Sequence, residues 1–185
     1  MNGEIAKSKI YAEHTLAYIL NKLRNHDKTI KLLHEKKSDG WRKMKYPRGL
    51  FDRCIGFLSL NDINEEFISL TIPFHCKHIT VSNELYNKLC DKYEIELTSC
   101  EELFAKSDII IIQGDANDFK EKITSSLLDK IKDEALLVIV SDDVSFDEDA
   151  LLSTLKSQRI NALLSDKLSF AKDAADIDCI MFARI

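Results

Sequence analysis

The chain has 185 residues, 45% of them hydrophobic and 31% charged, with a net charge of −5 at pH 7. This length and composition are typical of one soluble domain with a full hydrophobic core. The acidic balance gives a nucleic-acid partner no electrostatic support, and no apolar run reaches the roughly 18–20 residues of a membrane span. The 5 cysteines contain no C-x-x-C motif, which excludes a zinc ribbon and indicates a reduced, cytoplasmic protein.

Residues 5–36 are predicted to form a long N-terminal helix with a break near 25–27. The apolar residues of this helix form one long stripe, which could cover its own domain or be buried against a partner chain. Residues 37–49 follow as a basic loop, in which Trp41 and Tyr46 could bind a phosphorylated or nucleic-acid partner, but the short patch and the acidic chain favour an ordinary surface loop. The stripe consists of apolar residues at helical spacing: Ile5, Ile10, Tyr11, Leu16, Ile19, Leu20 and Leu23.

From residue 54 onward, apolar strand patterns alternate with helical patterns, which predicts an α/β fold with a mostly parallel sheet. Two capping boxes, at 99–102 and 145–148, mark helix starts. The β-branched run at 108–113 is typical of a strand that is buried on both faces. The expected strands are 54–58, 78–81, 95–97, 108–113, 135–140, 160–164 and 179–182, and the expected helices are 62–70, 83–93, 99–106, 118–132 and 145–155.

The turn after the 54–58 strand is where a dinucleotide-binding fold carries G-x-G-x-x-G. Ser59, Asn61 and Asn64 stand at the three glycine positions. Glycines there let a pyrophosphate approach the amides of a helix N-terminus. Asn61 can adopt a left-handed backbone at some cost, and Asp62 is expected to cap the helix while repelling a diphosphate. The pattern therefore predicts a capped structural turn instead of a working dinucleotide site.

Several segments, in order and at matching spacing, resemble the nucleotide-binding domain of the D-isomer-specific 2-hydroxyacid dehydrogenases. The resemblance covers nearly the whole chain and implies one Rossmann-like, three-layer α/β/α domain over 1–185, without a separate substrate domain. The segments are A-E-H-T-L-A at 12–17, R-G-L at 48–50 with I-G at 55–56, E-E-L at 101–103 with K-S-D at 106–108, residues 123–132, and F-D-E-D-A-L at 146–151 with L-K-S at 155–157.

The same resemblance implies that the family's functional residues are replaced. Ser82 stands where an acid would bind the adenosine ribose, and Asp142 stands where an arginine would hold the substrate carboxylate. Ala171 and Arg184 fall at the positions of the assisting acid and the proton-transfer histidine. Arginine has no proton to exchange at neutral pH, so no catalytic residue and no cofactor are expected. The vestigial cofactor site would comprise Ser59, Asn61, Asp62, Asn64, Ser82, Gln113 and Ser141.

We therefore expect a non-catalytic interaction module, a homodimer formed through Ile5, Leu16, Ile19, Leu20 and Leu23. One alternative is a domain that still binds NAD(H) and needs a partner domain for oxidoreductase activity. Another is a sensor of a neutral or cationic small ligand at the carboxyl edge of the strands. The residues of that sensor site would be Ser59, Asn61, Gln113, Asp115, Ser141 and Asp142.

Two further clusters suggest metal sites, but both are better explained structurally. The acidic group at 142–149 has no D-x-D-x-D-G loop and is expected to be a solvated helix start. His75 and His78 are expected to form a loop pair without a supporting ligand set, and His14 to pack within its helix. No metal is therefore expected.

Overall fold

Seven parallel strands form the centre of the computed structural model, which describes residues 3–35, 48–113, 122–141, 144–165, 168–169, 172–174, 176–177 and 179–183. Their order is β3-β2-β1-β4-β5-β6-β7, and every pair of neighbours is parallel. The predicted α/β fold with a parallel sheet is thus confirmed. The strands are β1 Cys54–Phe57, β2 Lys77–Val81, β3 Glu96–Thr98, β4 Ile109–Gln113, β5 Leu136–Val140, β6 Asn161–Ser165 and β7 Ile180–Ala183.

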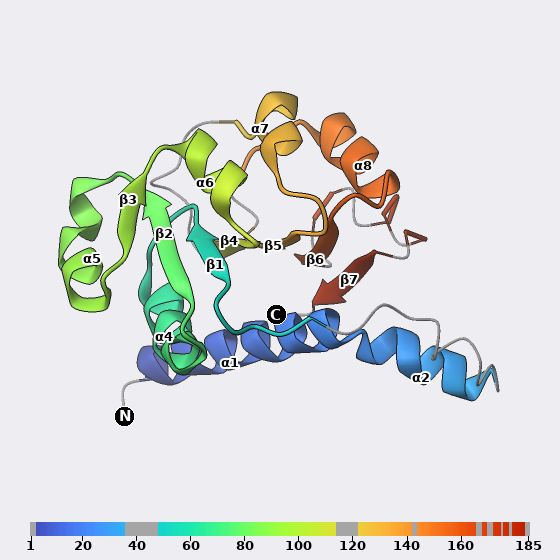
Figure 1. Ribbon diagram of the computed structural model, residues 1–185, viewed down its shortest axis with the longest axis horizontal. Helices are drawn as coiled ribbons and strands as arrows, with labels where there is room; N and C mark the ends of the chain where they lie inside the picture. Colours follow the sequence, from blue (N-terminus) through green and yellow to red (C-terminus); the bar gives the residue numbers. More distant parts are fainter. Residues whose placement is uncertain are drawn as a thin grey trace.

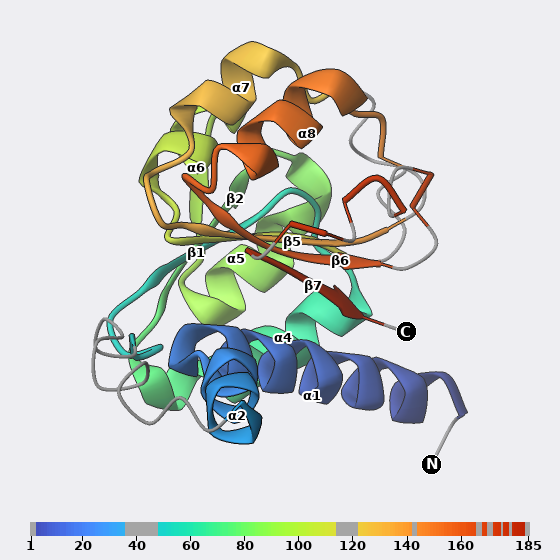
Figure 2. The same ribbon diagram turned by 90° about the vertical axis from the view of Figure 1, so that its right-hand side faces the viewer.

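Helices cover both faces of the sheet, which confirms the three-layer arrangement. Figures 1 and 2 show α6, α7 and α8 on one face and α1, α4 and α5 on the other. None of the described helices is long and apolar enough to cross a membrane. The helices are α1 Gly3–Arg24, α2 His26–His34, α4 Asp62–Thr71, α5 Asn87–Tyr93, α6 Cys100–Lys106, α7 Ser125–Lys130 and α8 Glu148–Lys156, with 3-10 turns η1 Ile72–Phe74 and η2 Glu84–Tyr86.

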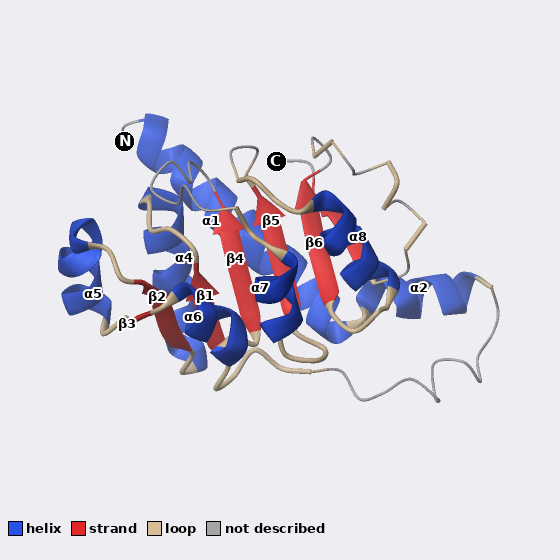
Figure 3. Ribbon diagram, turned by 90° about the horizontal axis from the view of Figure 1, so that it is seen from above, coloured by secondary structure: helices blue, strands red, loops and turns tan. Residues whose placement is uncertain are grey.

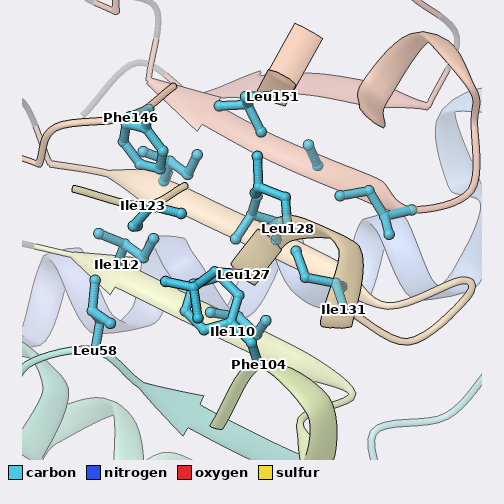
Figure 4. Packing of buried hydrophobic residues seen from close by; sticks show 14 of the residues in the cluster. Leu58, Phe104, Ile110, Ile112, Ile123, Leu127, Leu128, Ile131, Phe146 and Leu151 are labelled. Atoms are coloured by element: carbon cyan, nitrogen blue, oxygen red, sulfur yellow. The ribbon is translucent and has the colours of Figure 1, made fainter. Parts of the chain in front are cut away.

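The β-branched run of β4 supplies side chains to two separate cores. Ile110 and Ile112 belong to the cluster beneath α6, α7 and α8, which Figure 4 shows from close by. Ile109 and Ile111 belong to the opposite cluster, beneath α1 and α4. Successive side chains of a strand point to opposite faces, so a strand that is covered on both sides must be apolar throughout.

Gly56, in the middle of β1, allows α6 to pack closely on the sheet. A Cβ at this position would meet Ser107 Oγ and lie 2.9 Å from two side-chain carbons of Leu103. Ser107 Oγ is itself held by a 2.7 Å hydrogen bond to Leu103 O. Because these atoms are anchored to the end of α6, they cannot move aside freely, and the contact requires glycine.

The N-terminal helix breaks where expected and partly covers its own domain. Asn25 has φ 54°, in the left-handed region, and separates α1 from α2. Ala12, Thr15 and Ile19 are fully buried, on the side of α1 that packs mainly against α4. Ile10, by contrast, is 53% exposed. The apolar stripe is thus divided between the domain's own core and the solvent.

The predicted helix over 118–132 is present but shorter in the part that the structure describes. Only Ser125–Lys130 is helical, and 114–121 lie outside the described residues. Ile123 instead forms a parallel bridge with Phe146. Its amide donates to Ser145 O at 2.9 Å, and its side chain is fully buried. Burial in the tertiary structure therefore overrides the helical pattern at this point.

Two other helix starts differ from their predicted form. The N-cap of α8 is Asp147, whose Oδ1 accepts from Ala150 N at 3.2 Å, so the capping box predicted to begin at Ser145 is shifted by the Phe146 bridge. Residues 83–93 begin with η2 before α5. Ser99 does cap α6 as predicted, accepting from Glu102 N at 3.2 Å.

Candidate functional site

The candidate site lies where the winding of the sheet reverses, between β1 and β4. From β1 the chain winds outward to β2 and β3, and then it returns to β4 on the other side of β1. Open parallel sheets hold ligands at the carboxyl ends of the strands at such a reversal. Ser59 follows β1 and Gln113 ends β4, and Leu58 N donates to Ile111 O at 3.1 Å between them. We call this place the β1–β4 switch point.

Asn61 caps α4 by accepting hydrogen bonds from amides at the start of that helix. Its Oδ1 accepts from Ile63 N and from Asn64 N, both at 3.0 Å. Its Nδ2 donates to Gln113 O at 2.8 Å. Asp62 was predicted to be the cap. It lies instead in the first turn, exposed, where its negative charge still interacts favourably with the helix dipole.

The backbone of Asn61 is that of an ordinary N-cap residue. Its φ of −142° and ψ of −179° are extended, so Asn61 does not use the left-handed conformation that was open to it. An N-cap residue ordinarily has such an extended backbone, because only then can its side chain reach the second and third helical amides. No glycine is therefore required at this position.

Asn64, at the third glycine position, fills the turn from inside. Its side chain is fully buried, and its Nδ2 donates to Ser59 O at 2.8 Å. Three buried oxygens here, Ser59 Oγ, Asn64 Oδ1 and Gln113 Oε1, have no hydrogen-bond partner among the described residues. The two amide oxygens accept but cannot donate, so they offer nothing to a phosphate group.

Gln113 links the switch point to the N-terminal helix. Its Nε2 donates to Thr15 Oγ1 at 2.8 Å, and both side chains are buried. Thr15 therefore belongs to the site, although the sequence did not single it out. The available signal was a polar residue on the buried side of an amphipathic helix, next to Ala12 and Ile19.

The remaining predicted site residues are spread along the carboxyl edge. Ser82 is exposed after β2, and its amide donates to Thr98 O at 3.0 Å. Ser141 is buried directly after β5. The other predicted positions lie outside the described residues, namely Asp115, Asp142, Asp143, Ala171 and Arg184.

A dinucleotide fits these residues poorly. The amides of Ile63 and Asn64, which a pyrophosphate would use, already donate to Asn61. Asn64 places a buried amide where glycine would leave room, and Ser82 supplies no carboxylate for a ribose. No step of a reaction can therefore be assigned to a bound cofactor at this turn.

The histidine pair separates in the structure. His78 lies inside β2 and is buried, as the predicted strand over 78–81 implies, whereas His75 is exposed after η1, so the two do not form the expected loop pair. Burial lowers the pKa of His78 to about 4. Within the described part of the chain, no group of three or more histidine, cysteine, aspartate or glutamate side chains could hold a metal ion.

A family model agrees with this fold. The model of the D-isomer specific 2-hydroxyacid dehydrogenase NAD-binding domain matches residues 16–177. No curated protein sequence matches the chain.

Solved structures share the fold at low sequence identity. A phosphoglycerate oxidoreductase from Rhizobium etli has a TM-score of 0.78 and 16% identity, over 95% of this chain and 55% of that one. D-2-hydroxyisocaproate dehydrogenase has a TM-score of 0.74 and 18% identity, over 94% of this chain and 57% of that one. An acyclic imino acid reductase, solved with NADPH and D-Arg, has a TM-score of 0.73 and 23% identity, over 95% of this chain and 57% of that one. The chain thus spans little more than half the length of these proteins.

Proposed function

Because the chain belongs to the D-isomer specific 2-hydroxyacid dehydrogenase family and matches its NAD-binding domain, we propose that it is a non-catalytic member that acts by association. In this proposal two copies form a homodimer through their N-terminal helices. The supporting observation is an apolar surface on these helices that the domain itself does not cover. We call it the N-terminal apolar surface; it consists of Ile10 on α1 with Ile30 and Leu33 on α2.

The N-terminal apolar surface has two separate parts, because Ile10 lies near the start of α1, whereas Ile30 and Leu33 lie on α2, which extends beyond the other end of α1 (Figure 1). Ile10, Ile30 and Leu33 are 53%, 52% and 58% exposed. Figures 1 and 3 show α2 extending away from the sheet, beyond the helices that cover it. Complete burial of a fully exposed side chain of this size contributes roughly 1.5–3 kcal/mol, so a partner that covers the exposed half of each would gain about half of that amount per side chain.

This surface differs from the stripe that the sequence suggested. Ile19 is fully buried against its own domain and is not available to a partner. Leu16, Leu20 and Leu23 are half-buried and pack on the core beneath α1. The side chain of Ile5 lies outside the described residues. The proposed contact therefore moves from the centre of α1 toward Ile10 and α2.

The non-catalytic part of the proposal is supported by the replaced functional positions. Asp142 stands where the family's substrate-binding arginine is expected, and Arg184 where its proton-transfer histidine is expected. At the switch point, Asn61 accepts the hydrogen bonds of the α4 amides that a pyrophosphate would use. Each change removes a different requirement of hydride transfer.

Sedimentation velocity at micromolar concentration tests the association. We expect a dimer for the wild type and a monomer for Leu33→Glu, because a carboxylate at a buried apolar contact is strongly unfavourable. Leu85→Glu is the matched control, since Leu85 is 74% exposed on η2 and lies outside the proposed contact. A wild-type protein that sediments as a monomer at these concentrations would count heavily against the proposal.

A second candidate function is residual NAD(H) binding, with a partner domain supplying the missing groups. It is favoured by the family match, whose model describes an NAD-binding domain. Calorimetric titration with NADH separates the two candidates. A dissociation constant below about 100 μM, equivalent to more than about 5 kcal/mol, would require Asn61 to release the amides and would favour this second function.

A further inference from the structure

We infer that the Asn61 side chain is an internal replacement for the pyrophosphate of a dinucleotide, and that it closes the β1–β4 switch point. This inference concerns how the turn is filled and holds whether or not the chain dimerises. Three separate features of the turn support it: the contacts of Asn61 with the helix amides, the brace between Asn61 and the end of β4, and the filling of the space beneath the turn.

The first feature is the contact geometry of Asn61. A pyrophosphate at a helix N-terminus would accept hydrogen bonds from the free amides of the first turn. Asn61 Oδ1 accepts from two of those amides, Ile63 N and Asn64 N, each at 3.0 Å. One oxygen of the protein thus does for α4 what a phosphate oxygen would do. A ligand would have to displace that oxygen before it could bind.

The second feature is a brace that holds Asn61 in this position. Its Nδ2 donates to Gln113 O at 2.8 Å, so both ends of the amide are engaged. Ser or Asp at the N-cap could also accept from the helix amides, but neither could donate through a side-chain nitrogen to the end of β4. The choice of asparagine therefore joins α4 to the neighbouring strand as well as capping the helix.

The third feature is the filling of the space beneath the turn. Asn64 is fully buried and donates to Ser59 O at 2.8 Å. Gln113 continues the chain of hydrogen bonds through its Nε2 to Thr15 Oγ1 on α1, also at 2.8 Å. Displacement of Asn61 would thus disturb a polar network that runs from α4 through β4 to α1, as well as the cap of α4.

Hydrogen exchange of the amides of Ile63 and Asn64, with and without about 10 mM inorganic pyrophosphate, tests the inference. In the wild type we expect both amides to be protected and pyrophosphate to leave their exchange unchanged. In Asn61→Gly we expect exchange to be about tenfold faster, as for the loss of one hydrogen bond, and to be slowed again by pyrophosphate. Asn61→Asp keeps the cap and should keep the protection, even if the glycine variant is too unstable to measure.

Asn83→Gly is the matched control. Asn83 also caps a helix, accepting from Leu85 N at 3.0 Å, but it does so at η2, away from β4. This variant should leave exchange at Ile63 and Asn64 as in the wild type, with or without pyrophosphate. The inference is overturned if pyrophosphate slows exchange in the wild type. It is also overturned if Asn61→Gly exchanges like the wild type, or gains no response to pyrophosphate.

Discussion

His78 on β2 and Thr71 at the end of α4 are joined side chain to side chain in the layer between helix and sheet, with 2.9 Å between His78 Nε2 and Thr71 Oγ1. Thr71 Oγ1 also lies 3.1 Å from Phe67 O and 3.0 Å from Ile68 O, to which it donates. The hydroxyl oxygen is then the acceptor for His78 Nε2. This arrangement favours a neutral imidazole that carries its proton on Nε2.

The buried imidazole predicts that the folded state loses stability in mild acid. Burial lowers the pKa of His78 from 6.5 to about 4. The unfolded chain therefore binds the proton more readily, and the free energy of unfolding falls as the pH drops from 6.5 toward 4. A difference of this size corresponds to about 3 kcal/mol in total.

Urea unfolding at several pH values between 7.5 and 4 measures this loss. His78→Gln keeps a donor for Thr71 but cannot be protonated, so its stability should fall much less in the same range. His75→Gln, at an exposed position, serves as the control and should follow the wild type. Parallel pH curves for the wild type and His78→Gln would contradict the assignment.

Restoring a family glycine at Asn64 should weaken the protein. Asn64→Gly removes the buried donor of Ser59 O and puts glycine inside α4, and we expect a loss of about 2–3 kcal/mol in unfolding free energy. Chemical denaturation followed by circular dichroism gives the number. Asn87→Gly, exposed in the first turn of α5, should cost no more than about 1 kcal/mol. Equal losses in the two variants would show that the buried contact contributes nothing.

A methyl group at Gly56 should separate α6 from the sheet. In Gly56→Ala the new Cβ meets Ser107 Oγ and the side chain of Leu103, and overpacking of this kind typically costs about 1–3 kcal/mol. Gly49→Ala is the control, because its nearest neighbour would be Phe51 N at 3.9 Å, an ordinary contact. Thermal unfolding compares the two variants. A melting temperature of Gly56→Ala at or above that of Gly49→Ala would disprove the close packing.

The hydrogen bond between Thr15 and Gln113 should couple α1 to the sheet. Thr15→Val leaves Gln113 Nε2 buried without its acceptor, and we expect a loss of about 1–3 kcal/mol. The double variant Thr15→Val with Gln113→Leu removes both polar groups and should lose less than the sum of the single variants. A double-mutant cycle from urea unfolding measures that coupling. Strict additivity would mean that the two side chains do not interact in solution.

Much of the fold could be predicted from local patterns. The run Ile109–Ile112 has no polar face, which is enough to predict a strand covered on both sides. The stop at Asn25 and the cap at Ser99 are equally local, since each depends on residues within one helical turn. Such features are determined by the sequence alone because the interacting groups are close together along the chain.

The candidate site depended on contacts that no local pattern contains. Asn61 and Gln113 are separated by 52 positions, and Thr15 and Gln113 by 98, yet each pair is joined at 2.8 Å. From sequence, Asn61 appeared as a replaced glycine and Asp62 as the cap. Only the tertiary structure decides which side chain caps α4, because the cap must also satisfy a carbonyl at the end of β4. The sequence determined that the glycines of the turn are replaced; the pairing of strands and helices determined what fills their place.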